Sequence, residues 1–428
     1  QEHAKKHLAN AVSYHYSRLE RRHQFDKKKN VLMIGNTGTG KTHLVEVVSD
    51  LIDVPFVKAD ATKFSATGYV GRSVSSLIKE LVDRADGNIQ RAEHGIIFID
   101  EIDKICSSGY RGGRDVSGRD VQTNLLKLLE QSEVDLTDTQ NPDVIMKKAE
   151  ARRRGEDDDQ KVNTEHILFI MSGAFPGLED DIADRMGDNR VGFNPGASPS
   201  ESDRDVDILK ECQPQDLVDY GLEDEFVGRL PVRAYLSDLT VDDLVTILNE
   251  SESSILKQYK RDFQSFGVEL SFTDDALHEI ARRASEHGVG ARGLVTVLED
   301  VLFEFMHELP GTDCEELTVD MNVLENPTKS LYESLIQAKW ESVRSQILND
   351  EDLNTQKITM QDEAFDRIVQ RALDGEIEIR NFLDTILEQL PHALNLIGVD
   401  EFVIDKKFAD NPNKRIDSVI TNHKSDQD

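Results

Sequence analysis

The chain has 428 residues, enough for two or three domains, and its 82 acidic against 50 basic side chains give a formal net charge of −32. This charge argues against a protein that binds nucleic acid or anionic membranes mainly by electrostatics. No apolar run approaches the roughly 18 residues of a spanning helix, and the N-terminus has no signal-peptide pattern. The three cysteines lie too far apart for a zinc knuckle. We expect a cytoplasmic protein with no zinc and with no membrane or nucleic acid partner.

Short apolar runs alternate with helical patterns through the first half of the chain. The runs occupy residues 31–34, 54–60, 95–100 and 166–171, and helices are predicted at 42–52, 73–84 and 121–130. Continuous apolar runs of this length are typical of parallel strands that are buried on both faces of a sheet. The pattern predicts an α/β domain over residues 1–238.

Beyond residue 239 the pattern becomes mainly helical, which predicts a small helical domain at 239–333. The segment 363–372 then matches 275–284 at a constant offset of 88, and the same offset carries Arg292 onto Arg380. With three residues dropped, 317–320 aligns with 402–405. We interpret 334–428 as a degenerate second copy of the small domain that ends, from Asn413, in a polar tail. Two unrelated amphipathic segments are the alternative, because helical periodicity alone can mimic a weak repeat.

A phosphate-binding signature, GxxxxGK[ST], occupies residues 35–42, directly after the first apolar run. Its glycines let backbone N–H groups surround a polyphosphate, Lys41 neutralises the β- and γ-phosphates, and the hydroxyl of Thr42 ligates Mg²⁺. A glycine-rich turn is the alternative, which the flanking strand and helix patterns disfavour. The pattern predicts ATP and Mg²⁺ as ligands, with ATP contacts from Gly35, Asn36, Thr37, Gly38, Thr39, Gly40, Lys41, Thr42 and His43.

Two carboxylates, Asp100 and Glu101, follow the apolar run at 95–99. Asp100 is predicted to hold the Mg²⁺ shell, and Glu101 to orient and deprotonate an attacking water. An acidic pair after an apolar run can also cap a helix. Together with the phosphate-binding signature, the pair predicts an ATPase.

Several segments together resemble the ClpX family of AAA+ protein unfoldases, with the HslU unfoldase as a more distant relative. They occur in family order and are QEHAKKHLANAVSYHYSRL (1–19), the phosphate loop, GYVG (68–71), FIDEIDKI (98–105), RDVSG (114–118), HILFIMSGAF (166–175), GLEDEFVGRLPV (221–232) and GARGL (290–294). The resemblance implies a P-loop AAA+ large domain followed by a small helical lid domain. It also implies a homo-hexameric ring that uses ATP to unfold tagged proteins and pass them to a ClpP-like peptidase.

The resemblance assigns roles to three residues around the nucleotide. Arg229, in the sequence GRLP, is similar to the arginine finger that reaches the neighbouring subunit's γ-phosphate. Arg292, in the sequence GARGL, is similar to the sensor-2 arginine that couples nucleotide state to domain angle. Ser172 lies at the family's sensor-1 position. For an isolated arginine, a surface ion pair would be the simpler interpretation.

The resemblance also assigns loops that contact other proteins. Tyr69 and Val70 in GYVG are similar to the first pore loop, whose aromatic residue grips substrate, and Arg114 falls on the second pore loop. Without the family, Tyr69 would be interpreted as a buried residue of a turn. The tripeptide Val191-Gly192-Phe193 resembles the family's peptidase-docking motif, and a loop end that packs on its own domain is the alternative.

The chain departs from the family at two places. We expect it to lack the family's N-terminal zinc-binding domain and to carry, at 334–428, a segment without counterpart in the usual architecture. Two other functions therefore stay open. One is a protein-remodelling chaperone that works without a peptidase, and the other is a DNA-remodelling AAA+ motor, which the acidic surface disfavours.

Overall fold

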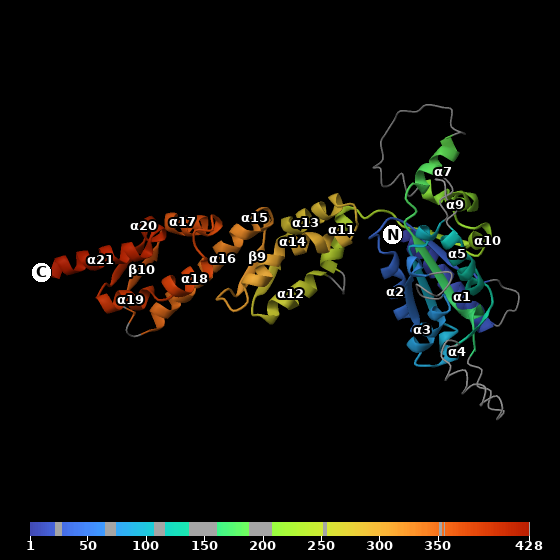
Figure 1. Cartoon of the computed structure of the whole chain (residues 1–428), viewed down its shortest axis with the longest axis horizontal. Helices are drawn as coiled ribbons and strands as arrows, with labels where there is room; N and C mark the ends of the chain where they lie inside the picture. Colours follow the sequence, from blue (N-terminus) through green and yellow to red (C-terminus); the bar gives the residue numbers. More distant parts are fainter. Residues whose placement is uncertain are drawn as a thin grey trace, which may run out of the picture. The chain divides into compact units, whose positions relative to one another are not determined.

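The computed structural model describes residues 1–21, 28–64, 74–106, 116–136, 161–187, 208–250, 255–350, 353–354 and 356–427. The chain divides into two compact units, Gln1–Asp238 (unit 1) and Leu239–Asp428 (unit 2) (Figure 1). No helix among these residues combines the length and the apolar character that crossing a membrane requires.

Unit 1 is built on a five-stranded parallel sheet, which confirms the predicted α/β fold. The strands lie in the order β2-β3-β6-β1-β7, and every neighbouring pair is parallel. Four of them correspond to the predicted apolar runs, whereas β7 was not predicted because its first two residues are only half-buried at the sheet edge. The strands are β1 (Val31–Ile34), β2 (Phe56–Asp60), β3 (Ile96–Asp100), β6 (Leu168–Gly173) and β7 (Val232–Tyr235).

Two hydrophobic cores cover the two faces of this sheet. Alternate residues of one strand point to opposite faces, so Val31 packs with Leu8 of α1 and Val45 of α2, whereas Leu32 packs in the core that contains α3 and α5. Both faces are therefore dry, as the continuous apolar runs predict. The helices of unit 1 are α1 (Glu2–Arg21), α2 (Lys41–Leu51), α3 (Ser76–Arg84), α4 (Ile89–Ala92), α5 (Val116–Leu129), α7 (Leu178–Gly187), α9 (Pro214–Tyr220) and α10 (Asp224–Gly228).

Short elements complete unit 1 around the sheet. An antiparallel pair joins β4 to β5, with Val134 opposite Val162. Single 3₁₀ turns follow β2 and β3, and another precedes β6. These elements are β4 (Glu133–Asp135), β5 (Lys161–Asn163), η1 (Ala61–Lys63), η2 (Ile102–Ile105) and η3 (Thr164–His166).

The buried histidine His15 fixes α1 to the amino-terminal edge of the sheet. Its Nε2 lies 2.8 Å from the backbone oxygen of His166, and only 1% of the residue is exposed. The pKa of His15 is lowered to about 3, mainly by burial and to a smaller extent by the cations Arg18 and Lys28, against the opposing effect of the hydrogen bond. The imidazole is therefore neutral in the folded protein at neutral pH.

The free energy of unfolding should fall as the pH is lowered from about 6.5 towards 3. In this range His15 binds a proton in the unfolded chain but stays neutral in the folded protein. The expected loss is about 1.4 kcal/mol per pH unit in this window. Urea unfolding at pH 7 and pH 5 should therefore show a larger loss for the natural chain than for His15→Gln, by about 2 kcal/mol. An equal pH dependence in the two proteins would contradict the buried neutral histidine.

Unit 2 combines helices with two parallel strand pairs. Strand β8 pairs with β9, with Leu270 opposite Leu317, and β10 pairs with β11, with Ile358 opposite Phe402. The strands are β8 (Glu269–Phe272), β9 (Glu316–Val319), β10 (Lys357–Met360) and β11 (Glu401–Ile404). The helices are α11 (Val241–Glu250), α12 (Ile255–Ser265), α13 (Asp274–Glu286), α14 (Arg292–Glu308), α15 (Met321–Glu325), α16 (Pro327–Asn349), α17 (Asp362–Leu373), α18 (Ile379–Phe382), α19 (Leu390–Ile397), α20 (Lys406–Asp410) and α21 (Pro412–Gln427).

The two strand pairs are followed by the same local hydrogen bonds. The amide of Thr273 donates to the oxygen of Val319, and the amide of Gln361 donates to the oxygen of Ile404, both at 3.1 Å. Asp320 and Asp405 each cap the short helix that follows, by accepting from the backbone N–H three residues later. Arg283 and Arg371 each donate through Nη1 to a backbone oxygen of these short helices.

One element differs between the two halves of unit 2. The single helix α14 has a broken counterpart, in which a π-helical turn, η4 (Leu383–Leu387), separates α18 from α19. A π-helical turn accommodates one inserted residue. The change in offset is a separate feature, because the offset falls from 88 at Arg380 to 85 at residues 402–405, which makes the second half three residues shorter there.

The end of the chain corrects one prediction, because residues from Asn413 were expected to be a polar tail. They form most of α21, which begins at Pro412 after Asn411 accepts a hydrogen bond from the amide of Lys414. Ile416 and Val419 pack against the core of unit 2. Proline at the first helical position and an asparagine cap are helix-start signals that the polar composition obscures.

Charged contacts join the two halves of unit 2. The ammonium of Lys339 lies 3.1 Å from Asp313, 3.4 Å from Asp384 and 2.7 Å from Glu388. Arg380, which aligns with Arg292, pairs with Glu308 at 2.9 Å. The guanidinium of Arg380 is therefore engaged within unit 2.

Candidate functional site

Three adjacent strands of unit 1 bring the predicted nucleotide residues to one edge of the sheet. The phosphate loop follows β1, Asp100 and Glu101 lie at the end of β3, and Ser172 lies near the end of β6, which runs between them. Parallel strands present all their carboxyl ends at the same edge, where ligands of open α/β sheets bind. Segments that are far apart in sequence thus form one site.

The phosphate loop has the backbone shape that a polyphosphate cradle requires. Gly38 and Gly40 have φ angles of 81° and 93°, in the left-handed region that favours glycine. A Cβ atom on Gly35 would lie 2.7 Å from the backbone oxygen of Leu236, so only glycine fits there. The loop leads into the N-terminus of α2, whose dipole favours anions.

Lys41, the first residue of α2, directs its ammonium into the loop. Its Nζ lies 2.6 Å from the backbone oxygen of Gly35 and 2.8 Å from that of Asn36. Only 8% of the residue is exposed. The positive charge is therefore held where the phosphates of a nucleotide would meet it.

The oxygens of Thr42 and Asp100 meet beside the loop. The hydroxyl of Thr42 donates to Asp100 Oδ2 at 3.4 Å, and the hydroxyl of Ser172 donates to Asp100 Oδ1. Hydroxyl and carboxylate oxygens are the donors that Mg²⁺ prefers, and Mg²⁺ in nucleotide sites takes only one or two protein ligands beside phosphates and water. The residues present fit a magnesium ion.

Glu101 leaves the strand in an unusual conformation. Its φ of 59° is left-handed, its backbone N–H donates to Asp100 Oδ1 at 3.0 Å, and its side chain is exposed. A non-glycine residue adopts this conformation at a cost of about 1 to 2 kcal/mol, and such residues cluster at functional sites. The turn separates the two carboxylates, so that Asp100 contacts Thr42 and Ser172 while the side chain of Glu101 is exposed.

Asp103 is a buried carboxylate of the site to which sequence reasoning assigned no role. It is 7% exposed, its Oδ1 accepts from the amide of Ala174 at 3.1 Å, and its Oδ2 pairs with Lys104 at 3.1 Å. It therefore ties the segment after β3 to the end of β6, which carries Ser172. A third acidic residue within the run IDEID was the available signal.

Arg229 lies at the opposite edge of the sheet from the phosphate loop. The side chain of the buried Asn30 donates to the backbone oxygen of Arg229 at 3.1 Å, and Asn30 directly precedes β1. The guanidinium of Arg229 pairs with Glu130, which follows α5. About 13 Å of strand separates Asn30 from the loop. The structure thus brings Arg229 near Asn30 and Glu130 and leaves it apart from its own nucleotide site.

The other predicted site residues do not join this cluster. His43 lies on α2 with an exposed side chain, and Arg292 is the exposed first residue of α14 in unit 2. Tyr69, Val70 and Arg114 lie outside the described residues. Val191, Gly192 and Phe193 also lie outside them.

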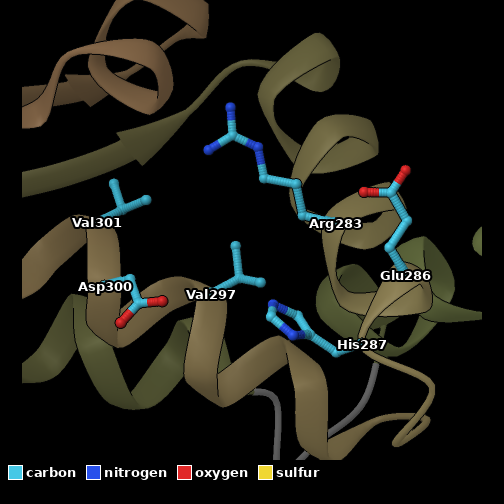
Figure 2. A pocket seen from close by; sticks show the side chains of 6 residues that line it. All are labelled: Arg283, Glu286, His287, Val297, Asp300 and Val301. Atoms are coloured by element: carbon cyan, nitrogen blue, oxygen red, sulfur yellow. The ribbon is translucent and has the colours of Figure 1, made fainter.

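Unit 2 contains a recess of about 300 Å³ between α13 and α14 (Figure 2). Its arginine, Arg283, already donates to Glu279 and to the backbone oxygen of Leu324. The lining carries both signs of charge and no glycine loop, so its chemistry differs from that of the phosphate site. It is lined by Arg283, Glu286, His287, Val297, Asp300 and Val301.

Comparison with known families agrees with this division of the chain. Residues 26–233 match the family described as "AAA domain (Cdc48 subfamily)". Residues 239–310 match the family described as "C-terminal, D2-small domain, of ClpB protein". The first match contains the whole of the described nucleotide site, and the second begins where unit 1 ends.

Curated relatives match most of the chain. The ATP-dependent Clp protease ATP-binding subunit ClpX of Bacteroides fragilis is 40% identical over 329 residues, which are 75% of this chain and 76% of the relative. The protein of the same name from Porphyromonas gingivalis is 39% identical over 326 residues, or 75% and 77%. ClpX 3 of Methylococcus capsulatus is 39% identical over 347 residues, or 76% and 77%. With this identity and coverage, and with the nucleotide site formed in unit 1, the chain belongs to the ClpX family of AAA+ ATPases.

Proposed function

We propose that the protein is the ATP-binding subunit of a Clp-type protease, which hydrolyses ATP to unfold proteins and move them through a hexameric pore to a ClpP-like peptidase. The observation that carries the proposal is the convergence of the phosphate loop, Asp100, Glu101 and Ser172 at one edge of the sheet, in a chain of the ClpX family. The peptidase partner is inferred from the names of the relatives, which describe them as ATP-binding subunits of the Clp protease.

The chemistry follows from the residues at that edge. Lys41 and the backbone N–H groups of the loop bind the β- and γ-phosphates, and Thr42 and Asp100 would hold Mg²⁺, which would neutralise charge on these phosphates. Glu101 orients the water and accepts its proton in the in-line attack. Ser172 fixes the carboxylate of Asp100 by its hydrogen bond, so that the metal ligand is preorganised.

Arg229 completes the site of a neighbouring subunit. Its place at the far edge of its own sheet supports action in trans, because β1 separates it from its own phosphate loop. In a ring, a head-to-tail interface brings the far edge of one subunit to the site of the next. The guanidinium then leaves Glu130 and stabilises negative charge on the γ-phosphate.

Arg292 and the second half of unit 2 have proposed roles that rest on the resemblance and on the local contacts. Arg292, which has no ion pair among the described residues, would contact nucleotide and report its state to unit 2. Residues 334–428 would be a degenerate copy of the small domain, which the matching bonds of Thr273 and Gln361 support. Because Arg380 pairs with Glu308, it would hold the two copies together instead of binding nucleotide.

The loops assigned to other proteins complete the proposal. Tyr69 and Val70 would grip the substrate chain, since an aromatic side chain on a glycine-flanked loop can contact any polypeptide. Arg114 would line the same channel. Val191 to Phe193 would dock on the peptidase as a short apolar anchor. A remodelling chaperone without a peptidase shares every part of the site and differs only in this last contact.

Mass measurement and coupled degradation test the proposal. With a slowly hydrolysed ATP analogue, the full chain should form a six-subunit particle, and a ClpP ring should then degrade a stably folded, tagged substrate. Tyr69→Ala should abolish unfolding while ATP hydrolysis persists. Deletion of residues 191–193 should abolish degradation while unfolding persists.

Two outcomes would decide against parts of the proposal. Unfolding by Tyr69→Ala at the natural rate would refute the pore-loop assignment. Unfolding without degradation by the natural chain, at saturating peptidase, would favour the chaperone.

A further inference from the structure

The last residues of unit 1 run alongside the phosphate loop. Strand β7 is parallel to β1, and the pairing continues past its end, where the amide of Leu236 donates to the oxygen of Ile34 at 2.8 Å. The close approach of Gly35 to the oxygen of Leu236 belongs to the same contact. The segment 236–238 is therefore a neighbour of the loop that binds phosphate.

A side-chain contact extends this pairing to the end of unit 1. The amide nitrogen of Asn36 donates to both carboxylate oxygens of Asp238, at 2.9 Å and 3.1 Å. Asp238 is the last residue of unit 1, and unit 2 begins at Leu239. The second residue of the phosphate loop thus contacts the point at which the two units are joined.

Asn36 is also contacted from the nucleotide side. Its backbone oxygen accepts from the ammonium of Lys41 at 2.8 Å and from the hydroxyl of Thr39 at 2.8 Å. A polyphosphate in the loop competes for the same ammonium and brings several negative charges towards Asp238. The arriving negative charge acts against the carboxylate of Asp238, because like charges repel.

We propose that Asp238 is a positioning residue of the ATPase site, and that its hydrogen bonds with Asn36 couple nucleotide binding to the segment that joins the units. Bound polyphosphate weakens the hold of Asn36 on Asp238. By linkage, Asp238 lowers the affinity of the loop for polyphosphate by the same factor. The inference rests on the proposed nucleotide site at residues 35–42 and extends it to the junction.

A second contact holds the same segment without touching the phosphate loop. The side chain of Gln1 donates to the oxygen of Ser237 at 2.6 Å and accepts from the amide of Ser237 at 3.1 Å. Substitution of Gln1 therefore loosens residues 236–238 while it leaves the charge next to the loop unchanged. It provides a matched control for a merely structural role of the segment.

The experiment measures affinity and hydrogen exchange on the full chain. Nucleotide affinity is measured with a slowly hydrolysed ATP analogue and with ADP, and amide exchange is followed at residues 236–240 with and without nucleotide. In the natural chain, nucleotide should speed exchange at these amides several-fold. Asp238→Asn, which keeps a hydrogen-bonding side chain and removes the charge, should bind the ATP analogue about two- to five-fold more tightly, with a smaller gain for ADP.

The remaining variants distinguish an effect of Asp238 on nucleotide binding from a merely structural role in holding residues 236–238. Asp238→Ala should show fast exchange at 236–240 whether or not nucleotide is bound. Gln1→Ala should also raise exchange, but its nucleotide affinity should equal that of the natural chain, and its exchange should still respond to nucleotide. Such a pattern would show that the charge and contact of Asp238, and not the order of the segment alone, act on the loop.

Two results would overturn the inference. One is an unchanged affinity in Asp238→Asn, and the other is exchange at 236–240 that ignores nucleotide in the natural chain. Failure of the nucleotide site itself would look different, because the natural chain would then bind neither nucleotide. The two failures are therefore distinguishable in one set of measurements.

Discussion

Glu101→Gln should bind ATP as tightly as the natural chain and hydrolyse it at least 100-fold more slowly. The amide keeps the shape and exposure of the side chain but cannot accept the proton of the attacking water, and general-base catalysis contributes about 10² to 10⁴ in rate. The contacts of Lys41 and Thr42 with the loop and with Asp100 are untouched. Nucleotide binding by equilibrium dialysis and phosphate release at saturating ATP measure the two properties.

Glu46→Gln is the matched control for this substitution. Glu46 lies on α2 in the same unit and pairs with Lys58 at 3.8 Å on the surface. An exposed pair of this kind contributes little, so hydrolysis should stay near the natural rate. If Glu101→Gln hydrolysed ATP at the rate of the natural chain, another group would have to be the general base.

Arg229→Ala should lower the ATPase rate of the assembled protein by about 10³-fold or more, because an arginine finger contributes about 10³ to 10⁵ in phosphoryl transfer. Loss of the ion pair with Glu130 adds little, since both side chains are nearly half exposed, at 47% and 46%. Arg91→Ala is the control, since Arg91 has a similar exposure of 44% and pairs with Asp53 on the surface. Its ATPase rate should not change.

Mixing two inactive variants tests whether Arg229 acts between subunits. An Arg229→Ala subunit keeps Glu101, and a Glu101→Gln subunit keeps Arg229, so some interfaces in a mixed ring contain both groups. An equal mixture should regain about a quarter of the natural rate if assembly is random around a head-to-tail ring. A mixture as inactive as its components would show that Arg229 serves its own subunit.

The strands that carry the nucleotide site could be predicted because each is buried on both faces. The predicted runs at 31–34 and 95–100 agree with β1 and β3 to within one residue. The edge strand β7 gives no such signal, because Val232 and Arg233 are half-buried and differ in polarity. The π-helical turn at Leu383–Leu387 was not among the predicted elements either.

In the candidate site, the residues in local motifs could be predicted from the sequence, whereas those that act through distant contacts could not. The phosphate loop and the acidic pair are local motifs, because few other residue types could replace their glycines and carboxylates in binding phosphate and metal. Asn30 and Asp238 act through partners about two hundred residues away in the chain, Arg229 and Asn36 respectively. Nothing in the neighbouring sequence marks such a pair, so only the folded chain reveals it.

Helix α16 sets a limit on how the chain can be shortened. Its 23 residues follow β9 and α15 of the first half of unit 2 and precede β10 of the second half. One helix therefore belongs to both halves. A chain cut after residue 333 would sever it near the first third and remove Leu335, Ile336 and Trp340 from a shared core. The sequence repeat and the unit of cooperative unfolding therefore have different lengths, and residues 239–428 are the smallest piece expected to melt as one.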